Sequence, residues 1–211
     1  MKKLVFLTLA LVVAASTLAV ADEVRVIYAR SSSNVSPWWG GSFNAMRFMV
    51  LWTKADLGFI QGGPINKIEW DRSSSTSGSF SLVRVYFGHS TRTALSTTFA
   101  TNYSDTPVQV LNATSKTVSG SSGTWWDMGI TPNTFTYNNT NNLIMEIRWR
   151  GDSGASCACY RGNGTAKRMW ANSDTATTGT VYNQAQHIRM TIANSTGVAP
   201  TSLGRVKSIF K

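Results

Sequence analysis

The amino-acid sequence predicts an all-β protein, an antiparallel, jelly-roll-like β-sandwich of about nine strands. Charged residues make up only 14% of the chain, whereas Ser, Thr, Asn, Gly and aromatic residues, which suit strands and tight turns, are abundant. Eight Trp and nine Phe provide enough apolar surface to exclude a disordered chain. Short apolar runs separated by turn-forming segments are typical of sandwiches and jelly rolls.

The clearest strand signal lies in residues 143–150, where apolar and polar side chains alternate with a period of two. We expect the apolar face of this strand to turn towards a core and the opposite face to be mostly exposed to solvent. The two faces consist of Leu143, Met145, Ile147 and Trp149 on one side and Ile144, Glu146, Arg148 and Arg150 on the other.

Eight further runs have the composition of strands, and Gly, Pro, Ser and Asn clusters separate nearly all of them. Only residues 53–58 have an internal helical pattern, a single turn that Gly58 is expected to end. The eight predicted strands are residues 24–29, 45–52, 65–71, 80–88, 106–111, 124–128, 166–170 and 187–193.

The N-terminal segment has the pattern of a secretory signal peptide. Lys2 and Lys3 precede an apolar run, and Ala19-Val20-Ala21 forms a small-residue cleavage site. We therefore expect residues 1–21 to be removed and residues 22–194 to form the domain of a secreted or cell-surface protein. The alternative is an uncleaved anchor, since about 17 apolar residues can just span a bilayer.

The predicted domain is followed by residues 195–211, a polar linker and a short amphipathic, cationic segment. One interpretation is a frayed terminus, and the other is a docking or sorting tail. The residues that would form the docking surface are Leu203, Arg205, Val206, Lys207, Ile209 and Phe210.

The chain is basic, and without Lys2 and Lys3 its 18 basic residues face 10 acidic ones. Such a charge raises the hypothesis of a nucleic-acid partner. The only close basic run in the domain lies around residues 161–168, and most of the other arginines are scattered. We therefore expect these arginines to form a solvated face or to bind an acidic surface of a partner, and we do not expect a nucleic-acid partner.

Five strand and turn patterns recur in a recognisable order: VRVYFGHS at 83–90, TPV at 106–108, GTWW at 123–126, TFTYNNTNNLI at 134–144 and IRMTI at 188–192. Together they resemble the jelly-roll-like β-sandwich modules of large bacterial surface proteins. With residues 53–71, the resemblance covers most of residues 38–193. Modules of this kind often precede a type IX secretion sorting domain, and most have no assigned reaction. The resemblance implies a binding or surface-building role, although only the short tail stands where a full sorting domain would be.

The sequence offers little catalytic machinery, and we expect the protein not to be an enzyme. A glycosidase needs two carboxylates across the scissile bond, and Glu69 and Glu146 lie on different predicted strands without a close acidic partner. No G-x-S-x-G motif accompanies His89 or His187, so a serine-type triad is disfavoured.

No cofactor is expected from the sequence. The two histidines lack the spacing of a zinc site. Asp152 or Asp174 could supply oxygen ligands to a structural calcium ion, but no calcium-loop motif is present. Cys157 and Cys159 flank one residue, and in an extended strand their Cβ atoms lie too far apart for a relaxed disulfide. We expect two buried free thiols, with a strained disulfide as the alternative.

Aromatic side chains are the best candidates for ligand contact, because flat rings can stack on sugar faces. Trp38 and Trp39 lie in a predicted loop, and Trp125 and Trp126 are adjacent on a strand, so one of that pair should face the core. The predicted ligand-binding residues are Trp38, Trp39, Trp125, Trp126, Arg148 and Arg150. The predicted core tryptophans are Trp52, Trp70, Trp149 and Trp170.

Three functions remain open at the level of sequence. The first is a non-catalytic binding or adhesion module, whose partner is a polysaccharide or another cell-surface component bound through exposed aromatic rings. The second is a self-associating subunit of an extracellular filament or surface layer. The third is an extracellular glycoside hydrolase that uses Glu69 or Glu146.

Overall fold

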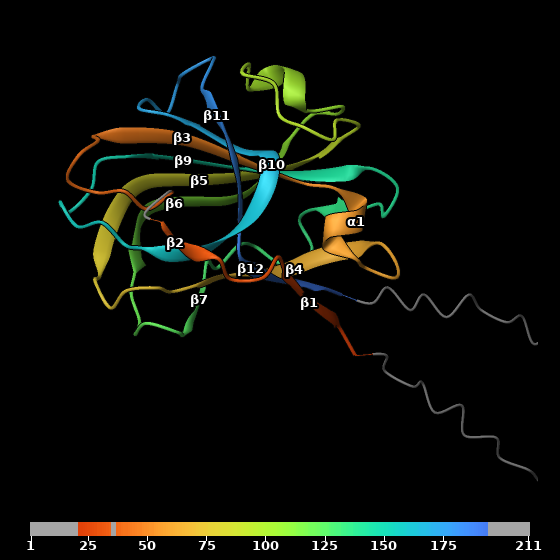
Figure 1. The fold of residues 1–211 in the computed structure, drawn as a ribbon, viewed down its shortest axis with the longest axis horizontal. Helices are drawn as coiled ribbons and strands as arrows, with labels where there is room; N and C mark the ends of the chain where they lie inside the picture. Colours follow the sequence, from red (N-terminus) through yellow and green to blue (C-terminus); the bar gives the residue numbers. More distant parts are fainter. Residues whose placement is uncertain (1–20, 35–36, 194–211) are drawn as a thin grey trace, which may run out of the picture.

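The computed structural model describes residues 21–34 and 37–193, which form two antiparallel β-sheets packed face to face (Figure 1). The predicted signal peptide and the predicted docking tail lie outside these residues, apart from Ala21. The smaller sheet has the order β1 (Glu23–Ile27), β12 (Ile188–Ile192), β4 (Gly63–Asp71), β7 (Trp125–Asp127), with β8 (Thr136–Tyr137) also paired to β4.

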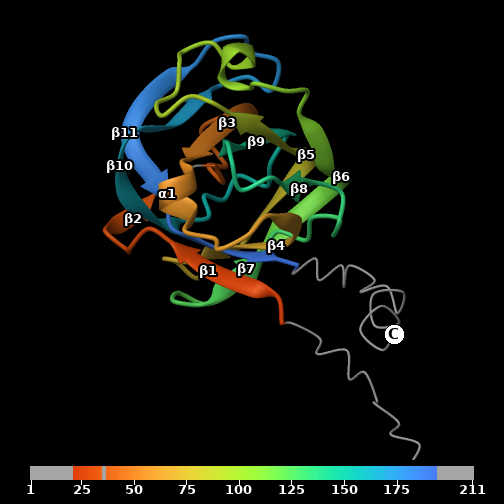
Figure 2. The same ribbon diagram turned by 90° about the vertical axis from the view of Figure 1, so that its right-hand side faces the viewer.

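The larger sheet forms the other layer. Its long strand β10 curves away from the layer at one side of the sandwich, together with β11 (Figures 1 and 2). The short strand β2 (Ser32–Asn34) pairs with this curved strand. The order of the sheet is β11 (Thr180–Gln186), β10 (Cys159–Ala171), β3 (Ala45–Trp52), β9 (Asn142–Arg150), β5 (Gly78–Ser90), β6 (Val108–Val118).

The prediction of an antiparallel β-sandwich is confirmed, and all nine predicted strands are present. The described residues form twelve strands, because β2, β8 and β11 also pair. Two of these are very short, and β11 (TVYNQAQ) has no apolar alternation that would mark it as a strand. The β11 segment is a strand because its backbone pairs with β10, and not because it buries an apolar face.

The predicted single helical turn is also confirmed, as α1 (Lys54–Leu57). Thr53 caps its first turn, the Asp56 side chain accepts from the backbone N–H of Thr53, and Gly58 ends it at φ +61°. None of the helices in the described ranges is long and apolar enough to cross a membrane.

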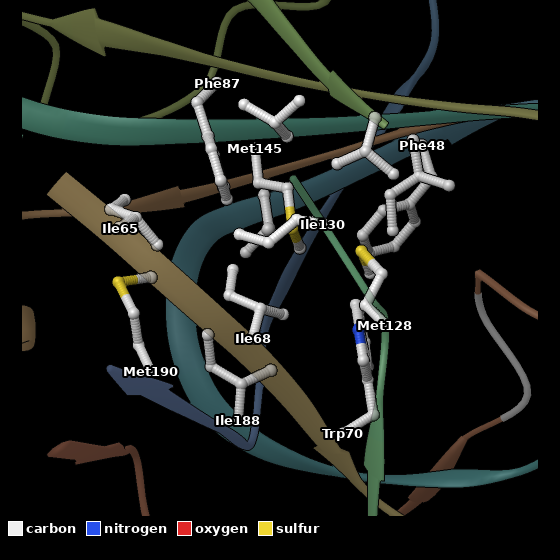
Figure 3. Close-up of a cluster of buried hydrophobic side chains, with 14 of the residues drawn as sticks. Phe48, Ile65, Ile68, Trp70, Phe87, Met128, Ile130, Met145, Ile188 and Met190 are labelled. Carbon is white, nitrogen blue, oxygen red and sulfur yellow. The ribbon is translucent and has the colours of Figure 1, made fainter. Parts of the chain in front are cut away.

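The core lies between the inner faces of the two sheets. Phe87, Phe48 and Met145 of the larger sheet face Ile68 and Trp70 of the smaller one (Figure 3). As predicted, the four apolar residues of one face of β9 are fully buried in this core. Met128 and Ile130, which follow β7, lie between the layers and complete the packing (Figure 3).

Trp38 belongs to this core, which corrects the prediction that it is an exposed loop residue. Its ring is fully buried, with centroids 5.3 Å from Phe80 and 5.4 Å from Trp126. The loop is held in place because the Trp149 indole donates to the Pro37 carbonyl at 2.8 Å. A Cβ at Gly40 would lie 2.3 Å from the Ala155 carbonyl oxygen, so only glycine allows this approach.

The outer face of the larger sheet is covered in part by a second apolar cluster. Residues 91–107, which include the 3-10 turn η1 (Ala100–Asn102), lie outside this sheet (Figure 1). Ile144 and Glu146 are therefore buried, although the sequence pattern predicted a mostly exposed face. The cluster consists of Met49, Leu51, Leu95, Phe99, Ile144 and Met169.

Cys157 and Cys159 are buried free thiols, as the spacing argument predicted. Burial raises the pKa of the Cys159 thiol to about 12, although the nearby Arg72 guanidinium acts in the opposite direction. Burial also raises the pKa of Cys157. Both side chains are therefore neutral thiols that contribute small apolar surfaces to the core.

Replacing Trp38 with Ala should destabilise the protein strongly, because it leaves a cavity between the two sheets. We expect a loss of about 3–5 kcal/mol in the free energy of unfolding, measured by urea denaturation. The adjacent Trp39→Ala variant is the matched control, since Trp39 is only partly buried, and it should lose clearly less. Equal losses for the two variants would contradict the burial of Trp38.

The thiols should resist alkylation in the native state, because only the thiolate form is nucleophilic and both pKa values are raised. At pH 8, maleimide labelling followed by intact mass measurement should add no label to the folded protein and two labels after denaturation in guanidinium. Rapid labelling of native protein would contradict this environment, and no labelling after denaturation would indicate a disulfide.

Candidate functional site

The adjacent pair Trp125 and Trp126 points to opposite sides of β7, as predicted. Trp126 packs in the core, while Trp125 is half-buried on the outer side of the smaller sheet. The Arg189 guanidinium lies over the Trp125 ring at 4.8 Å from its centroid, and the His187 ring is 5.2 Å away. The protein's own side chains therefore occupy much of the Trp125 surface.

Trp39 also packs against aromatic neighbours. Its ring centroid is 4.9 Å from Phe43 and 5.8 Å from Trp170, and Trp170 stacks on Tyr182 at an interplanar angle of 3°. The sequence predicted that Trp170 is a core residue. In the structure it is only half-buried, at the side of the core. The structure therefore does not bring the four predicted ligand-binding tryptophans together on one exposed surface.

The outer face of the larger sheet instead carries a row of arginines in cross-strand register. Arg47 on β3 lies opposite Arg148 on β9, which lies opposite Arg84 on β5, and Arg84 lies opposite Asn112 on β6. Neighbouring strands are about 4.8 Å apart. Like charges directly opposite each other destabilise a sheet, so this row requires compensating groups.

Glu146 compensates two of the three arginines. Its carboxylate accepts two bonds from Arg47, at 3.0 and 2.9 Å, and another from the Nε of Arg148. The Tyr103 hydroxyl donates to the same group at 3.2 Å. Burial and the Glu146 charge raise the pKa of Tyr103 well above its ordinary value, so its hydroxyl remains a neutral donor.

Asp174 compensates the other end of the cluster. Its carboxylate lies 2.8 Å from the Nη2 of Arg84 and 2.9 Å from the Nη2 of Arg150. Asp174 belongs to the loop between β10 and β11, so this ion pair connects that loop to β5 and β9. We call Arg47, Arg84, Arg148, Arg150, Glu146 and Asp174 the arginine cluster; it holds four cations and two anions.

The two signs of charge lie at different depths in the arginine cluster. The Glu146 and Asp174 side chains are only 1% and 2% exposed, whereas those of Arg84 and Arg150 are 33% and 57% exposed. The carboxylates therefore form the floor, and a molecule approaching this face meets guanidinium groups.

Two hollows border the cluster. The first hollow, of about 550 Å³, is lined by Leu82, Arg84, Tyr86, Gln109, Asn112, Arg150, Asp174 and Thr175. The second hollow, of about 600 Å³, is lined by Arg47, Ala100, Tyr103, Ser104, Asp105, Thr106, Pro107 and Arg148. Both arginines predicted from the sequence to bind ligand, Arg148 and Arg150, therefore line a hollow.

The wall of the first hollow combines a ring, exposed amides and a strained residue. The Tyr86 ring lies under the Arg148 guanidinium, 5.0 Å from its centroid, and Gln109 and Asn112 are exposed on β6. Leu82 has φ +50° and is 48% exposed. Such backbone conformations are uncommon for residues other than glycine and occur preferentially at functional sites.

The two glutamates considered for glycoside hydrolysis lie on opposite outer faces of the sandwich. Glu146 is on β9 of the larger sheet, and Glu69 is on β4 of the smaller sheet, where Arg189 donates to it at 2.6 and 2.7 Å. This contact lowers the pKa of Glu69. Glu69 and Glu146 therefore cannot act together on one glycosidic bond.

Ordinary protein contacts also account for the other residues considered for catalysis or metal binding. His89 pairs with Asp105 at 2.6 Å, and the His187 ring contacts both the Tyr28 carbonyl and Asp71. Asp152 accepts from two backbone N–H groups at a turn. The described ranges contain no group of three or more His, Cys, Asp or Glu side chains that could hold a metal ion.

Sequence reasoning found part of this site and missed the rest. It identified Arg148 and Arg150 from the strand at residues 143–150, but it missed Arg84 and Tyr86, and it considered Asp174 only as a possible calcium ligand. Arg84 and Tyr86 occupy the outward positions of the predicted strand 80–88, which was a usable signal. The strand order, which places β5 beside β9, could not be read from that signal.

Comparison with known proteins adds little to this description. No family model and no curated protein sequence matches the chain. Among solved structures, the chain is similar to the cysteine protease and lectin-like domains of Cwp84, a surface-layer-associated protein of Clostridium difficile. The identity is 6% and the TM-score 0.40, over 72% of this chain and 32% of that one. A likeness of this degree carries no assignment of function.

Replacing Glu146 with Gln should destabilise the protein by about 3–5 kcal/mol, because the change leaves two guanidinium groups without their buried counter-charge. Urea denaturation measures the loss. The control is Asp127→Asn, since Asp127 lies on the smaller sheet and its side chain is 47% exposed. That variant should change stability by less than about 1 kcal/mol. A similar small effect for Glu146→Gln would show that the buried pair contributes little.

Proposed function

We propose that this chain is a non-catalytic binding module of an exported or cell-surface protein, and that it holds a polysaccharide in the first hollow of the larger sheet. The observation that carries the proposal is the composition of this hollow. It combines the Tyr86 ring, the exposed amides of Gln109 and Asn112, and the guanidinium groups of Arg84 and Arg150.

These side chains match the chemistry of a sugar. Hydroxyl groups both donate and accept hydrogen bonds, amide side chains do the same, and guanidinium groups donate through five N–H bonds. An aromatic ring offers an apolar face to the C–H side of a sugar ring. An extended chain of sugars can be held along a shallow polar surface that would not enclose a small apolar ligand.

A binding role rather than catalysis is supported by the state of the acidic groups. Glu146 and Asp174, the carboxylates of the arginine cluster, are both held by two arginines and are almost inaccessible. Neither is placed to protonate a leaving group or to activate water from the hollow. The proposal therefore assigns these carboxylates to the positioning of the arginines.

A second candidate function, a subunit of a surface assembly, is supported by the edge of the smaller sheet. Strand β1 forms that edge, with β12 as its pairing partner. Val24 and Val26 are 52% and 55% exposed on it. An exposed edge strand with apolar side chains is a template for pairing with another chain.

Affinity gel electrophoresis of the purified protein, in gels that contain neutral or acidic polysaccharides, tests the first function. At least one polysaccharide should retard the protein, and Tyr86→Ala should weaken that retardation by about fivefold or more, because it removes the ring surface that lines the first hollow beside the Arg148 guanidinium. Trp39→Ala should leave it unchanged, since Trp39 lies outside the first hollow.

Circular dichroism first establishes that both variants are folded. Absence of retardation by every polysaccharide would overturn the proposed function. If the same protein then sediments as large assemblies in analytical ultracentrifugation, the second candidate replaces the first. An equal loss of binding in Tyr86→Ala and Trp39→Ala would show that the binding site is not the first hollow.

A further inference from the structure

We infer that the ligand of the first hollow is an acidic polysaccharide, whose carboxylate or sulfate group pairs with Arg84 and Arg150. This inference rests on the proposed function and specifies its substrate class.

The arginine cluster has an excess of two positive charges. Its four guanidinium groups share two carboxylates, and each carboxylate already serves two arginines. The Arg47 side chain is only 10% exposed, and Arg148 lines the second hollow. The positive charge at the first hollow therefore comes from Arg84 and Arg150, which share the buried carboxylate of Asp174. A polar concavity with an excess of one sign of charge concentrates ligands of the opposite sign.

Arg84 has an unpaired donor within this cluster. Its Nη2 is bonded to Asp174 at 2.8 Å, but its Nε is buried and has no hydrogen-bond partner among the described residues. A buried N–H group without an acceptor is costly. A carboxylate or sulfate offers several acceptor oxygens and forms strong, directional bonds with guanidinium, so an acidic ligand suits the Arg84 side chain, which is 33% exposed and, within the described ranges, bonded to one carboxylate only.

The arginines of the cross-strand row also favour an anionic ligand, because like charges lie close together there. Arg47, Arg148 and Arg84 occupy facing positions on three neighbouring strands, where like charges oppose one another. Glu146 and Asp174 offset part of this repulsion, and an anion in the first hollow adds a counter-charge beside Arg84.

The first hollow fits an anion better than the second. Arg84 and Arg150 line the first hollow, and the one carboxylate there, Asp174, is buried. The second hollow is lined by Asp105, whose side chain is 42% exposed and would repel an anion. The acidic group of the ligand is therefore assigned to the first hollow.

The same geometry favours an acidic sugar polymer over nucleic acid. Nucleic acids carry a phosphate on every nucleotide, and proteins that bind them neutralise many of these charges along an extended basic surface. Here Arg84 and Arg150, the two most exposed arginines of the cluster, lie together at one hollow. Beside it lie Tyr86, Gln109 and Asn112, groups that suit the uncharged part of a sugar.

The matched probes are polygalacturonate and the same polymer with its carboxylates converted to methyl esters, because they differ only in charge. In affinity electrophoresis at low salt, polygalacturonate should retard the purified protein at least tenfold more strongly than the ester. Retardation should weaken as salt is added, since exposed charges are screened. Single-stranded DNA of equal charge concentration serves as a third probe.

Arg84→Gln should lower the affinity for the acidic polymer about tenfold, the effect expected for one charge-assisted contact. The control is Lys54→Gln, which removes one equally charged group from the exposed start of α1. The control should leave affinity within about twofold of the unchanged protein. Circular dichroism establishes that both variants are folded.

The outcomes separate the inference from the proposed function. Equal retardation by the acid and the ester, or by a neutral glycan alone, overturns the acidic ligand and leaves the polysaccharide-binding function intact. An equal loss in Arg84→Gln and Lys54→Gln, or tighter binding of DNA, shows general charge attraction and also overturns the inference. Retardation by no glycan at all removes the proposed function itself.

Discussion

The buried carboxylate of Glu146 connects the larger sheet to the segment that covers it. It accepts from Arg47 on β3, from Arg148 on β9 and from Tyr103 in the connection between β5 and β6. An almost fully buried charge is tolerated only when several donors surround it. Because those donors come from two strands and one connection, the carboxylate holds β3, β9 and that connection together, and it presents Arg148 at the surface.

Asp174 has the corresponding role on the other side of the arginine cluster, where it connects the β10–β11 loop to Arg84 and Arg150. The second apolar cluster, with Leu95 and Phe99 packed over Met49, covers another part of the same face. Apolar packing therefore covers one region of the outer face and buried acids hold arginines in another. Two polar hollows border the arginine cluster on this face.

The tryptophans show how local sequence misleads about which side chains are exposed. Trp38 stands beside Pro37 and before Gly40 in a segment with loop composition, yet the loop inserts its ring between the sheets, against Phe80 and Trp126. A large apolar side chain in a loop gains more free energy from burial than from exposure. Whether burial is available depends on the space between distant strands, and the sequence of the loop contains no information about that space.

The sequence by itself determined the all-β class, the nine main strands, the single helical turn that Gly58 ends and the inward face of β9. These properties follow from periodicity and from backbone preferences, which act between residues a few positions apart. The tertiary structure alone decided the strand order, the polar strand β11 and the site. Arg47, Arg84 and Arg148 lie far apart in the chain, and only the pairing of β3, β9 and β5 places them in one row. A cross-strand site is a property of register, and register is established by the packing of the whole sandwich.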